Sequence, residues 1–483
     1  MVIDALKYQI LQQFGFVPTE EQGQALDAFA RFLTDRDPDA VMILRGSAGT
    51  GKTSLSGAIV RTLKAIRQKV MLLAPTGRAA KVFSLNSGCP AYTIHRRIYR
   101  EKSFAGVDGQ FNLNDNLFTD TLFMVDEASM ISNLGFGGGN FGSGCLLDDL
   151  VRFVYQGHND RLMLIGDKAQ LPPVGEEESP ALNRMMLEGY GLKVYECDLN
   201  EVLRQSQESG ILYNATVIRQ MITHDDITQL PLIRFKGFAD IVMMPGNELV
   251  ESLANSYYRV GQDETMVITR SNKRANIYNN GIRNMVLDRE DELSCGDMLM
   301  IVKNNYFWTE KERNEAKEAL NAIPPFLANG DRAKVLRVSR HMELYGFRFA
   351  TLLLQFPDYD NYEMSVTALL DTLQSEAPAL THEQQEQLFH GVEEDYQDVP
   401  LKADRMKAIR GDQYFNALQV KYAYAITCHK AQGGQWEHVY VDQGYMTDDM
   451  LTPDYIHWLY TAFTRAKDKL FLVNWPKTQT EQA

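Results

Sequence analysis

The pattern best suited to chemistry in this sequence is a phosphate-binding signature, G-x-x-x-x-G-K-T, at residues 46–53. It follows an apolar run at 41–44 and precedes a helical stretch at 54–65, the strand–loop–helix context that such a loop requires. Glycines there let backbone N–H groups converge on phosphates at a helix N-terminus, where the helix dipole favours anions. Lys52 would neutralise the β- and γ-phosphates of ATP, and Thr53 would ligate Mg²⁺. The residues predicted to bind the nucleotide are Gly46, Ala48, Gly49, Thr50, Gly51, Lys52 and Thr53.

Two adjacent carboxylates, Asp126 and Glu127, end a second apolar run at 121–125. A carboxylate at the end of a strand beside the phosphate-loop strand can hold the Mg²⁺ shell, so we assign Asp126 to the metal. Glu127 could polarise the attacking water, which favours hydrolysis over nucleotide storage. Gln170 follows a further run at 162–165 and could contact a γ-phosphate, although the two prolines after it also suit a simple strand-ending turn.

The elements that position these residues are expected to be parallel strands. Apolar runs at 41–44, 70–73, 121–125 and 162–165 alternate with helical stretches, which is the spacing that βαβ units produce. A polar segment at 100–120 interrupts them and suits a small hairpin. A second alternating block starts near 194, and strand-like runs followed by an acidic stretch interrupt it between about 324 and 411. The sequence therefore predicts an α/β fold with inserted subdomains.

Composition excludes several classes of protein. The 483 residues suggest roughly three domains, and 45% hydrophobic with 23% charged residues is typical of a globular protein. No apolar run approaches the roughly 20 residues that span a bilayer, and we expect neither a membrane partner nor a signal peptide. Five cysteines without a C-x-x-C pair argue against a zinc module or disulfide framework, so we expect a cytoplasmic protein.

Net charge gives a mixed indication about nucleic acid. The formal charge of −14 argues at first against such a partner. However, residues 357–410 hold 12 acids and 4 bases, a net of −8, so basic patches remain possible elsewhere. The acidic run itself is more typical of a solvated face than of a binding tail.

Six motifs occur in an order that resembles one known family. They are G-S-A-G-T-G-K-T, A-P-T-G-R-A-A, D-E-A-S, G-D-K-A-Q-L-P-P-V, C-H-K-A-Q-G and Y-T-A-F-T-R-A-K-D. Together they resemble the superfamily 1 helicases, specifically the RecD-like and phage Dda-like group that moves 5′ to 3′. The resemblance extends from residue 19 to 469 and implies two tandem RecA-like P-loop NTPase domains with ATP in the cleft between them.

The same resemblance implies a domain plan with two insertions. The first RecA-like domain would cover residues 1–198, with a small insertion at about 99–121. The second would cover 199–323 and 412–483, and an SH3-like β subdomain with an acidic helical stretch would be inserted at 324–411. The resemblance implies no role for the acidic stretch or for the glycine-rich segment at 135–144.

Further ATP-site residues follow from the resemblance. Gln22 resembles the family's adenine-reading glutamine, although Thr19 and Gln22 also form the pattern of a helix capping box. Arg204 and Arg465 resemble the two arginines that the second domain directs at the γ-phosphate, where an arginine stabilises developing charge. The predicted catalytic residues are thus Glu127, Gln170, Arg204 and Arg465.

Candidate contacts to single-stranded DNA lie after strands of both domains. They are Pro75, Thr76 and His95 in the first domain, and Thr427 and His429 in the second. His95 could stack on a base or bind phosphate. Such contacts do not read sequence, so little base specificity is expected. Aromatic residues between 99 and 118 could wedge between strands or simply pack that subdomain.

The sequence and the resemblance together predict an ATP-dependent DNA helicase. It would move 5′ to 3′ on single-stranded DNA and unwind tailed duplex DNA, with ATP and Mg²⁺ bound between its domains. Two alternatives stay open: a DNA-stimulated ATPase that remodels protein–DNA complexes without strand separation, and a P-loop regulatory ATPase that gates a protein partner. The sequence does not choose between pathways such as DNA repair and recombination.

Overall fold

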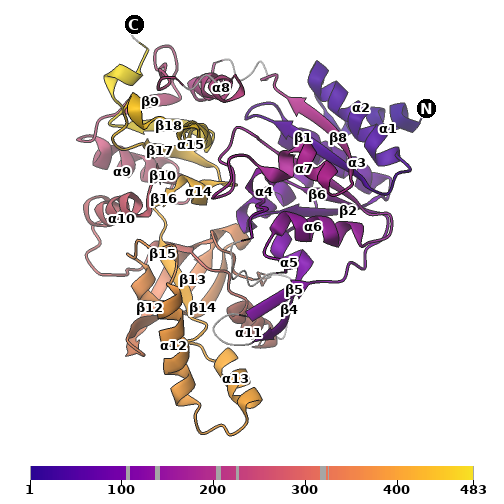
Figure 1. The fold of residues 1–483 in the computed structure, drawn as a ribbon. Helices are drawn as coiled ribbons and strands as arrows, with labels where there is room; N and C mark the ends of the chain where they lie inside the picture. Colours follow the sequence, from indigo (N-terminus) through magenta and orange to yellow (C-terminus); the bar gives the residue numbers. More distant parts are fainter. Residues whose placement is uncertain are drawn as a thin grey trace.

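Two parallel β-sheets and a closed β-barrel organise the chain (Figure 1). The computed structural model describes residues 2–104, 109–135, 142–202, 208–224, 228–315, 323–324 and 326–481. The first sheet has the strand order β3-β2-β6-β7-β1-β8, and all neighbouring strands are parallel. Its strands are β1 (Ala40–Gly46), β2 (Lys69–Ala74), β3 (Ala91–Thr93), β6 (Thr121–Val125), β7 (Arg161–Gly166) and β8 (Lys193–Leu199).

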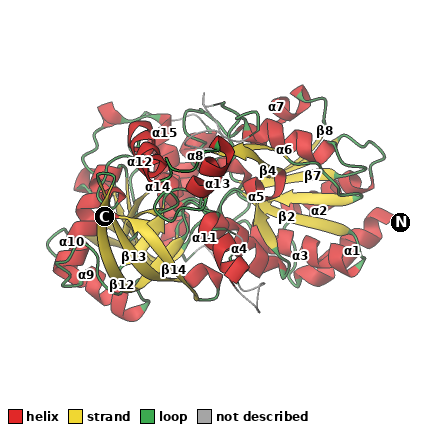
Figure 2. Cartoon of the chain, turned by 90° about the horizontal axis from the view of Figure 1, so that it is seen from below, coloured by secondary structure: helices red, strands yellow, loops and turns green. Residues whose placement is uncertain are grey.

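Helices cover both faces of this sheet (Figure 2). Strands β1, β6 and β7 are buried along their whole length, which explains their nearly continuous apolar sequence. One face carries α1 (Val2–Phe14), α2 (Glu20–Thr34), α3 (Lys52–Ala65) and α4 (Gly77–Ser87). The other carries α5 (Ile94–Ile98), α6 (Leu146–Tyr155) and α7 (Arg184–Gly189).

The second sheet has the order β16-β10-β17-β18-β9 and is also parallel. Its strands are β9 (Ile241–Met244), β10 (Thr265–Thr269), β16 (Ala425–Thr427), β17 (Trp436–Asp442) and β18 (Ala466–Val473). Its helices are α8 (Gly210–Thr223), α9 (Leu249–Arg259), α10 (Asn272–Gly281), α14 (Cys428–Ala431) and α15 (Pro453–Phe463). The predicted α/β class with two tandem domains is confirmed.

One grouping of strands is wrong. The apolar run near 194 was expected to start the second alternating block, but it forms β8, which pairs with β1 at the edge of the first sheet. The run lies within the segment 1–198 that was predicted for the first domain. Its local sequence suits a strand in either sheet, because strand pairing depends on long-range packing. The chain crosses to the second domain only after Leu199.

The inserted β subdomain is larger than the predicted segment 324–411. Its barrel consists of β11 (Met298–Ile301), β12 (Arg332–Leu344), β13 (Phe347–Phe356), β14 (Tyr362–Leu369) and β15 (Leu418–Tyr422). Strands β11 and β15 lie outside the predicted bounds and pair with each other antiparallel. They close the barrel, and barrel closure is a tertiary contact that their short apolar sequences do not indicate.

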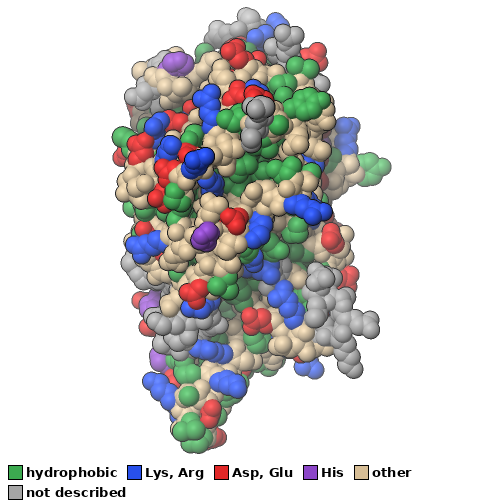
Figure 3. Space-filling model, turned by 90° about the vertical axis from the view of Figure 1, so that its right-hand side faces the viewer, with side chains coloured by type: hydrophobic (Ala, Val, Ile, Leu, Met, Phe, Trp, Pro, Cys, Tyr) green, Lys and Arg blue, Asp and Glu red, His purple; other side chains and the backbone are tan. Residues whose placement is uncertain are grey.

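The acidic stretch forms two helices on the barrel, α12 (His382–Asp395) and α13 (Lys402–Arg410). Leu388, Val392 and Ile409 of these helices share a small core with Phe349 of β13. The helices extend away from the two sheets at the lower end of Figure 1. In Figure 3, acidic and basic side chains are interspersed on the face shown.

One pair of strands and one helix complete the set of strands and α-helices among the described residues. β4 (Tyr99–Phe104) and β5 (Gly109–Leu113) form an antiparallel pair, which agrees with the hairpin expected at 100–120. Helix α11 (Phe307–Glu315) precedes β12.

Within the described ranges, no helix combines the length and the apolar character that crossing a membrane would need. Most of the glycine-rich segment 135–144 lies outside the described residues.

Candidate active site

The phosphate-binding loop connects β1 to α3. Gly49 and Gly51 have φ angles of +76° and +82°, in the left-handed region where a side chain is disfavoured. At Gly46, a Cβ atom would lie 2.8 Å from the Cγ atom of Lys52. The glycines of the motif are therefore required by the backbone path and by the close approach of the lysine.

Lys52 lies across this loop. Its Nζ atom donates hydrogen bonds to the carbonyl oxygens of Gly46 at 2.5 Å and Ser47 at 3.0 Å. The Thr50 hydroxyl donates to the same Ser47 carbonyl at 2.8 Å. Thr53 is exposed in the first turn of α3. The structure thus places Lys52 and Thr53, the predicted phosphate ligand and one predicted Mg²⁺ ligand, together at one helix N-terminus.

Gln22 is buried beside this loop, with 1% of its surface exposed. Its side-chain oxygen accepts from the Thr19 N–H at 3.0 Å, and the Gln22 N–H donates to the Thr19 hydroxyl, so the capping box is formed. The amide nitrogen of Gln22 donates to the Thr50 carbonyl at 2.9 Å. Gln22 therefore supports the loop, while its contact with adenine stays a prediction.

Asp126 and Glu127 end β6, but β7 lies between this strand and β1. The expectation that the carboxylates follow a strand directly beside the phosphate-loop strand is wrong, because β7 pairs with both β6 and β1. Burial, and then the charge of Glu127, raises the pKa of Asp126 to about 7. Glu127 has a φ angle of +52°, an uncommon conformation that is found at functional sites.

These carboxylates fit a bound Mg²⁺. In the described part of the chain, no three His, Cys, Asp or Glu side chains converge as a metal cluster. Mg²⁺ usually needs only one or two protein ligands when nucleotide phosphates and water complete its octahedron. The hydroxyl of Thr53 and the carboxylate of Asp126 supply such a donor set, and a divalent cation would relieve the crowding of Asp126 and Glu127.

Gln170 lies in the loop after β7. This loop belongs to the first domain and is hydrogen-bonded to the second domain. The Gln170 side chain is 7% exposed, and its buried Oε1 atom has no hydrogen-bond partner among the described residues. Four hydrogen bonds link residues 167–171 to the second domain. They are Tyr460 OH to Asp167 Oδ2 at 2.7 Å, His457 Nδ1 with the Ala169 carbonyl at 2.9 Å, Leu171 N–H to the Thr461 hydroxyl at 2.8 Å, and Gln432 Nε2 to the Leu171 carbonyl at 2.7 Å.

Of the two predicted arginines of the second domain, the structure describes only Arg465 and does not bring it to the phosphate-binding loop. Arg204 lies outside the described residues. Arg465 is buried, and its guanidinium donates to the Thr461 carbonyl at 3.0 Å, the Gly434 carbonyl at 3.2 Å and the Thr464 hydroxyl at 3.1 Å. All three acceptors belong to its own domain, so the contact of Arg465 with a γ-phosphate stays a prediction.

Two other side chains of the second domain do form hydrogen bonds with the loop, and sequence reasoning missed both. The Ala48 N–H donates to the Tyr460 hydroxyl at 3.0 Å, and the Arg219 guanidinium donates to the Ser47 hydroxyl. Tyr460 is the first residue of the Y-T-A-F-T-R motif, which offered a signal. Arg219 lies on α8, where no recognised motif marked it.

Thr76, a predicted DNA contact of the first domain, lies against a segment of the second domain. This residue follows Pro75 after β2, and its hydroxyl caps α4 by accepting from the Ala79 N–H at 3.2 Å. A Cβ atom on Gly433 would lie 3.1 Å from the Thr76 hydroxyl oxygen. Thr427 begins the same second-domain segment at the end of β16, and the following His429 is exposed.

His95 lies on α5, at the end of β3. Its ring centroid is 5.7 Å from that of Tyr99, and burial lowers its pKa to about 4. The ring is therefore neutral at pH 7, which favours stacking over an ionic contact with phosphate. Two residues further along α5, Arg97 supplies a positive charge, and its guanidinium lies 4.7 Å from the ring centroid of Phe118.

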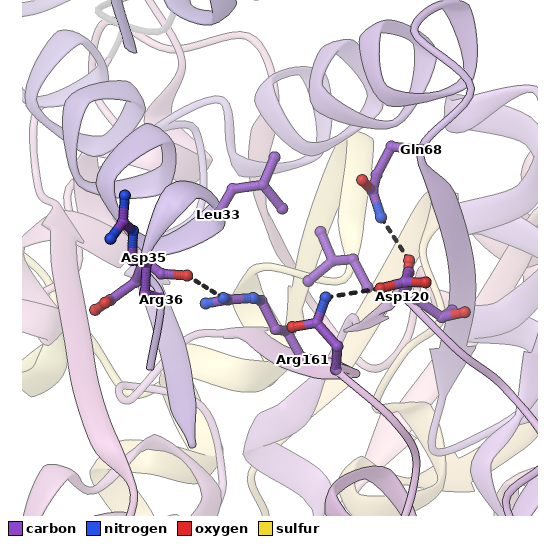
Figure 4. A pocket seen from close by; sticks show the side chains of 9 residues that line it. Leu33, Asp35, Arg36, Gln68, Asp120 and Arg161 are labelled. Atoms are coloured by element: carbon purple, nitrogen blue, oxygen red, sulfur yellow. Dashed lines mark hydrogen bonds between the residues drawn. The ribbon is translucent and has the colours of Figure 1, made fainter. Parts of the chain in front are cut away.

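A separate pocket of about 560 Å³ lies at the opposite edge of the first sheet (Figure 4). It is lined by residues at the amino ends of β6 and β7 and at the end of α2, including Asp120, Arg161 and Asp35. Gln68 donates to the Asp120 carbonyl at 2.7 Å within it. It contains none of the predicted site residues, because the phosphate-binding loop lies at the carboxyl ends of these parallel strands.

Comparison with known families gives two matches. Residues 19–228 match the model of an AAA domain, and residues 422–473 match that of a UvrD-like helicase C-terminal domain. The first match includes the phosphate-binding loop and both carboxylates, and the second includes Thr427, His429 and Arg465.

Two curated relatives match about a third of the chain. An ATP-dependent RecD2 DNA helicase of Deinococcus radiodurans is 30% identical over 157 residues, which are 32% of this chain and 18% of that protein. An uncharacterized protein of Methanocaldococcus jannaschii is 33% identical over 171 residues, 33% of this chain and 14% of that protein. The chain thus spans less than a fifth of the length of these two relatives.

Two further proteins are similar to this one over most of the chain. An uncharacterized protein of Acanthamoeba polyphaga mimivirus is 22% identical over 490 residues, covering 89% of this chain and 94% of that protein. A solved structure of Pif1 helicase from Bacteroides, in complex with ADP-AlF3 and ssDNA, is 14% identical with a TM-score of 0.46, covering 97% and 95% of the two chains. In its ordered motifs, its two parallel sheets and the two family matches, the chain is similar to the superfamily 1 helicases of the RecD-like kind.

Proposed function

We propose that this protein is an ATP-dependent DNA helicase. It hydrolyses ATP at the P-loop, moves 5′ to 3′ along single-stranded DNA, and separates the strands of tailed duplex DNA. The observation that carries this proposal is a set of contacts from the loop after β7, which contains Gln170, to Thr76, a predicted DNA-binding residue. DNA as the partner and the 5′ to 3′ direction rest on the family.

The contacts begin at Gln170 and end at Thr76. Gln170 precedes Leu171, whose carbonyl accepts the 2.7 Å hydrogen bond from Gln432. Gly433, the next residue, lies against the Thr76 hydroxyl. A shift of the loop after β7 would therefore be transmitted through the buried side chain of Gln432 to Thr76, which is predicted to contact a phosphate of the DNA strand. This is the coupling that a nucleic-acid motor requires.

The proposed hydrolysis divides its tasks among four residues. Lys52 neutralises the phosphates, Thr53 and Asp126 hold Mg²⁺, and Glu127 orients and deprotonates the attacking water. The bound Mg²⁺ would supply positive charge to the β- and γ-phosphate oxygens. Since phosphoryl transfer depends mainly on positioning and charge, closure of the second domain on the loop would complete the site.

ATP hydrolysis by the purified protein tests the proposal. It is measured at fixed low salt with no nucleic acid, with single-stranded DNA and with single-stranded RNA. Strong stimulation by DNA alone is expected, followed by unwinding of a 5′-tailed but not a 3′-tailed duplex. Equal rates in all three reactions would contradict the motor and favour a regulatory ATPase. Stimulation without unwinding would favour a remodelling ATPase.

Substituting Gln432→Ala is expected to uncouple the two sites. The change removes the hydrogen bond to Leu171, so ATP and DNA should each still bind while stimulation of hydrolysis by single-stranded DNA falls at least about ten-fold. Gln435→Ala is the matched control, because that glutamine is exposed three positions further along. If both variants kept full stimulation, the proposed coupling route would be wrong.

A further inference from the structure

Two helices of the second domain, α8 and α15, cover the phosphate-binding loop. Ser47 accepts a hydrogen bond from Arg219 of α8, and the Ala48 N–H donates to Tyr460 of α15 at 3.0 Å. At Gly49, a Cβ atom would lie 3.3 Å from a methyl carbon of Leu212, also on α8. Consecutive loop residues thus each meet a side chain of the second domain.

Tyr460 uses both hydrogen-bonding functions of its hydroxyl. The oxygen accepts from the Ala48 N–H, and the hydrogen goes to Asp167 Oδ2 at 2.7 Å. Burial, and then the charge of Asp167, raises the pKa of Tyr460 well above 10, so the hydroxyl keeps its proton. Backbone N–H groups of such a loop bind phosphate oxygens, so the hydroxyl lies where a phosphate oxygen would compete for the Ala48 N–H.

Arg219 holds the same loop from the other helix. Besides the Ser47 hydroxyl, its guanidinium donates to the Asn200 carbonyl at 3.3 and 3.4 Å. These acceptors are neutral, so they leave the positive charge of Arg219 available to an anion. Asn200 lies in the segment that joins the two domains, and its N–H donates to Glu21 Oε2 at 2.5 Å.

We propose that Arg219 contacts the terminal phosphate of bound ATP, and that Tyr460 competes with the nucleotide for the Ala48 N–H. This inference rests on the proposed function and adds two residues to the site. A phosphate above Ser47 would give Arg219 a charged acceptor in place of a neutral one, and such bonds are roughly twice as strong. Phosphate oxygens would displace the Tyr460 hydroxyl, so α15 would respond directly to nucleotide binding.

Displacement of the Tyr460 hydroxyl would also affect residues outside the loop, because α15 forms other hydrogen bonds between the two domains. His457 and Thr461 of this helix hold Ala169 and Leu171 on either side of Gln170. Arg465 follows the same helix and is bonded back to Thr461. Release of Tyr460 would therefore loosen the helix that retains Arg465 within its own domain.

The test of Arg219 compares two nucleotides. Affinities for fluorescent forms of ADP and of a non-hydrolysable ATP analogue are measured for the wild type, Arg219→Gln and Arg219→Lys. Arg219→Gln should lower the affinity for the ATP analogue about ten-fold, while the affinity for ADP changes less than about two-fold. Arg219→Lys should restore part of the lost affinity for the ATP analogue. An unchanged ratio of the two affinities would overturn this role for Arg219, because a merely structural defect would weaken both nucleotides together.

The test of Tyr460 uses the nearly isosteric Tyr460→Phe. Removing the competing hydroxyl should tighten binding of both nucleotides about five-fold, and unchanged or weaker binding would overturn the competition. Arg234→Gln serves as the control for Arg219→Gln. This half-exposed arginine belongs to the same domain, and its guanidinium stacks on Tyr213 of α8. A wild type that binds neither nucleotide, as expected for Lys52→Ala, would overturn the proposed function as well. Normal wild-type binding with wild-type-like variants would overturn this inference alone.

Discussion

Substituting Glu127→Gln should lower the rate of ATP hydrolysis by about 10²–10⁴-fold, the usual contribution of a general base. The amide keeps the size and hydrogen-bonding shape of the carboxyl group but cannot accept the proton of the attacking water. Binding of ATP and of single-stranded DNA should persist, because Lys52, Thr53 and Thr76 are untouched. Steady-state hydrolysis and equilibrium binding of a labelled strand measure the two effects separately.

The matched control for this variant is Glu176→Gln, a glutamate that accepts hydrogen bonds from residues 132–134 outside the proposed site. It should hydrolyse ATP at close to the wild-type rate. Normal turnover by Glu127→Gln would remove Glu127 from the catalytic role. A loss of nucleotide binding together with turnover would instead indicate that the left-handed turn at Glu127 supports the loop rather than the chemistry.

The second large effect is expected for Arg465→Lys. If Arg465 stabilises charge on the transferring phosphoryl group, hydrolysis should fall by about 10³–10⁵-fold, because a lysine lacks the planar fork of donors. In the structure the guanidinium reaches Thr461, Gly434 and Thr464, so this role requires it to leave those acceptors during the cycle. Hydrolysis at saturating ATP and single-stranded DNA checks the prediction.

A thermal melt must accompany that assay, since Arg465 is buried and its loss also removes hydrogen bonds. The expected pattern is a melting temperature within a few degrees of the wild type together with the large loss of turnover. Unchanged turnover would refute the assignment. If turnover and stability fell together while Arg219→Gln alone removed discrimination between ATP and ADP, Arg219 would be the principal arginine at the γ-phosphate.

The family-level plan was readable from the sequence because each motif follows one strand. A P-loop depends on glycines within eight consecutive residues, and the left-handed angles of Gly49 and Gly51 are local properties. The hairpin at 99–113 and the acidic helices were likewise visible as local patterns. The capping box at Gln22 is another local feature, and the structure contains it as well as a bond to Thr50.

The limits of the sequence lie in long-range pairing. β8 joined the first sheet and β11 and β15 closed the barrel, although nothing in their composition indicated these partners. The order of strands also separated β6 from β1 by β7. In each case a short apolar strand can pair in several places, and the choice depends on how whole faces of a sheet are buried.

By itself, the sequence indicated that Lys52 and Thr53 begin the helix after the phosphate-binding loop and that Asp126 and Glu127 follow a buried strand, because a few neighbouring residues set these positions. Only the tertiary structure decided which side chains of the second domain reach that loop. Arg219 and Tyr460 do so across 172 and 412 residues of sequence, whereas Arg465 is held within its own domain. Contacts between residues so far apart in sequence form when the two domains pack against each other. The spacing of residues within one segment does not indicate how two domains pack.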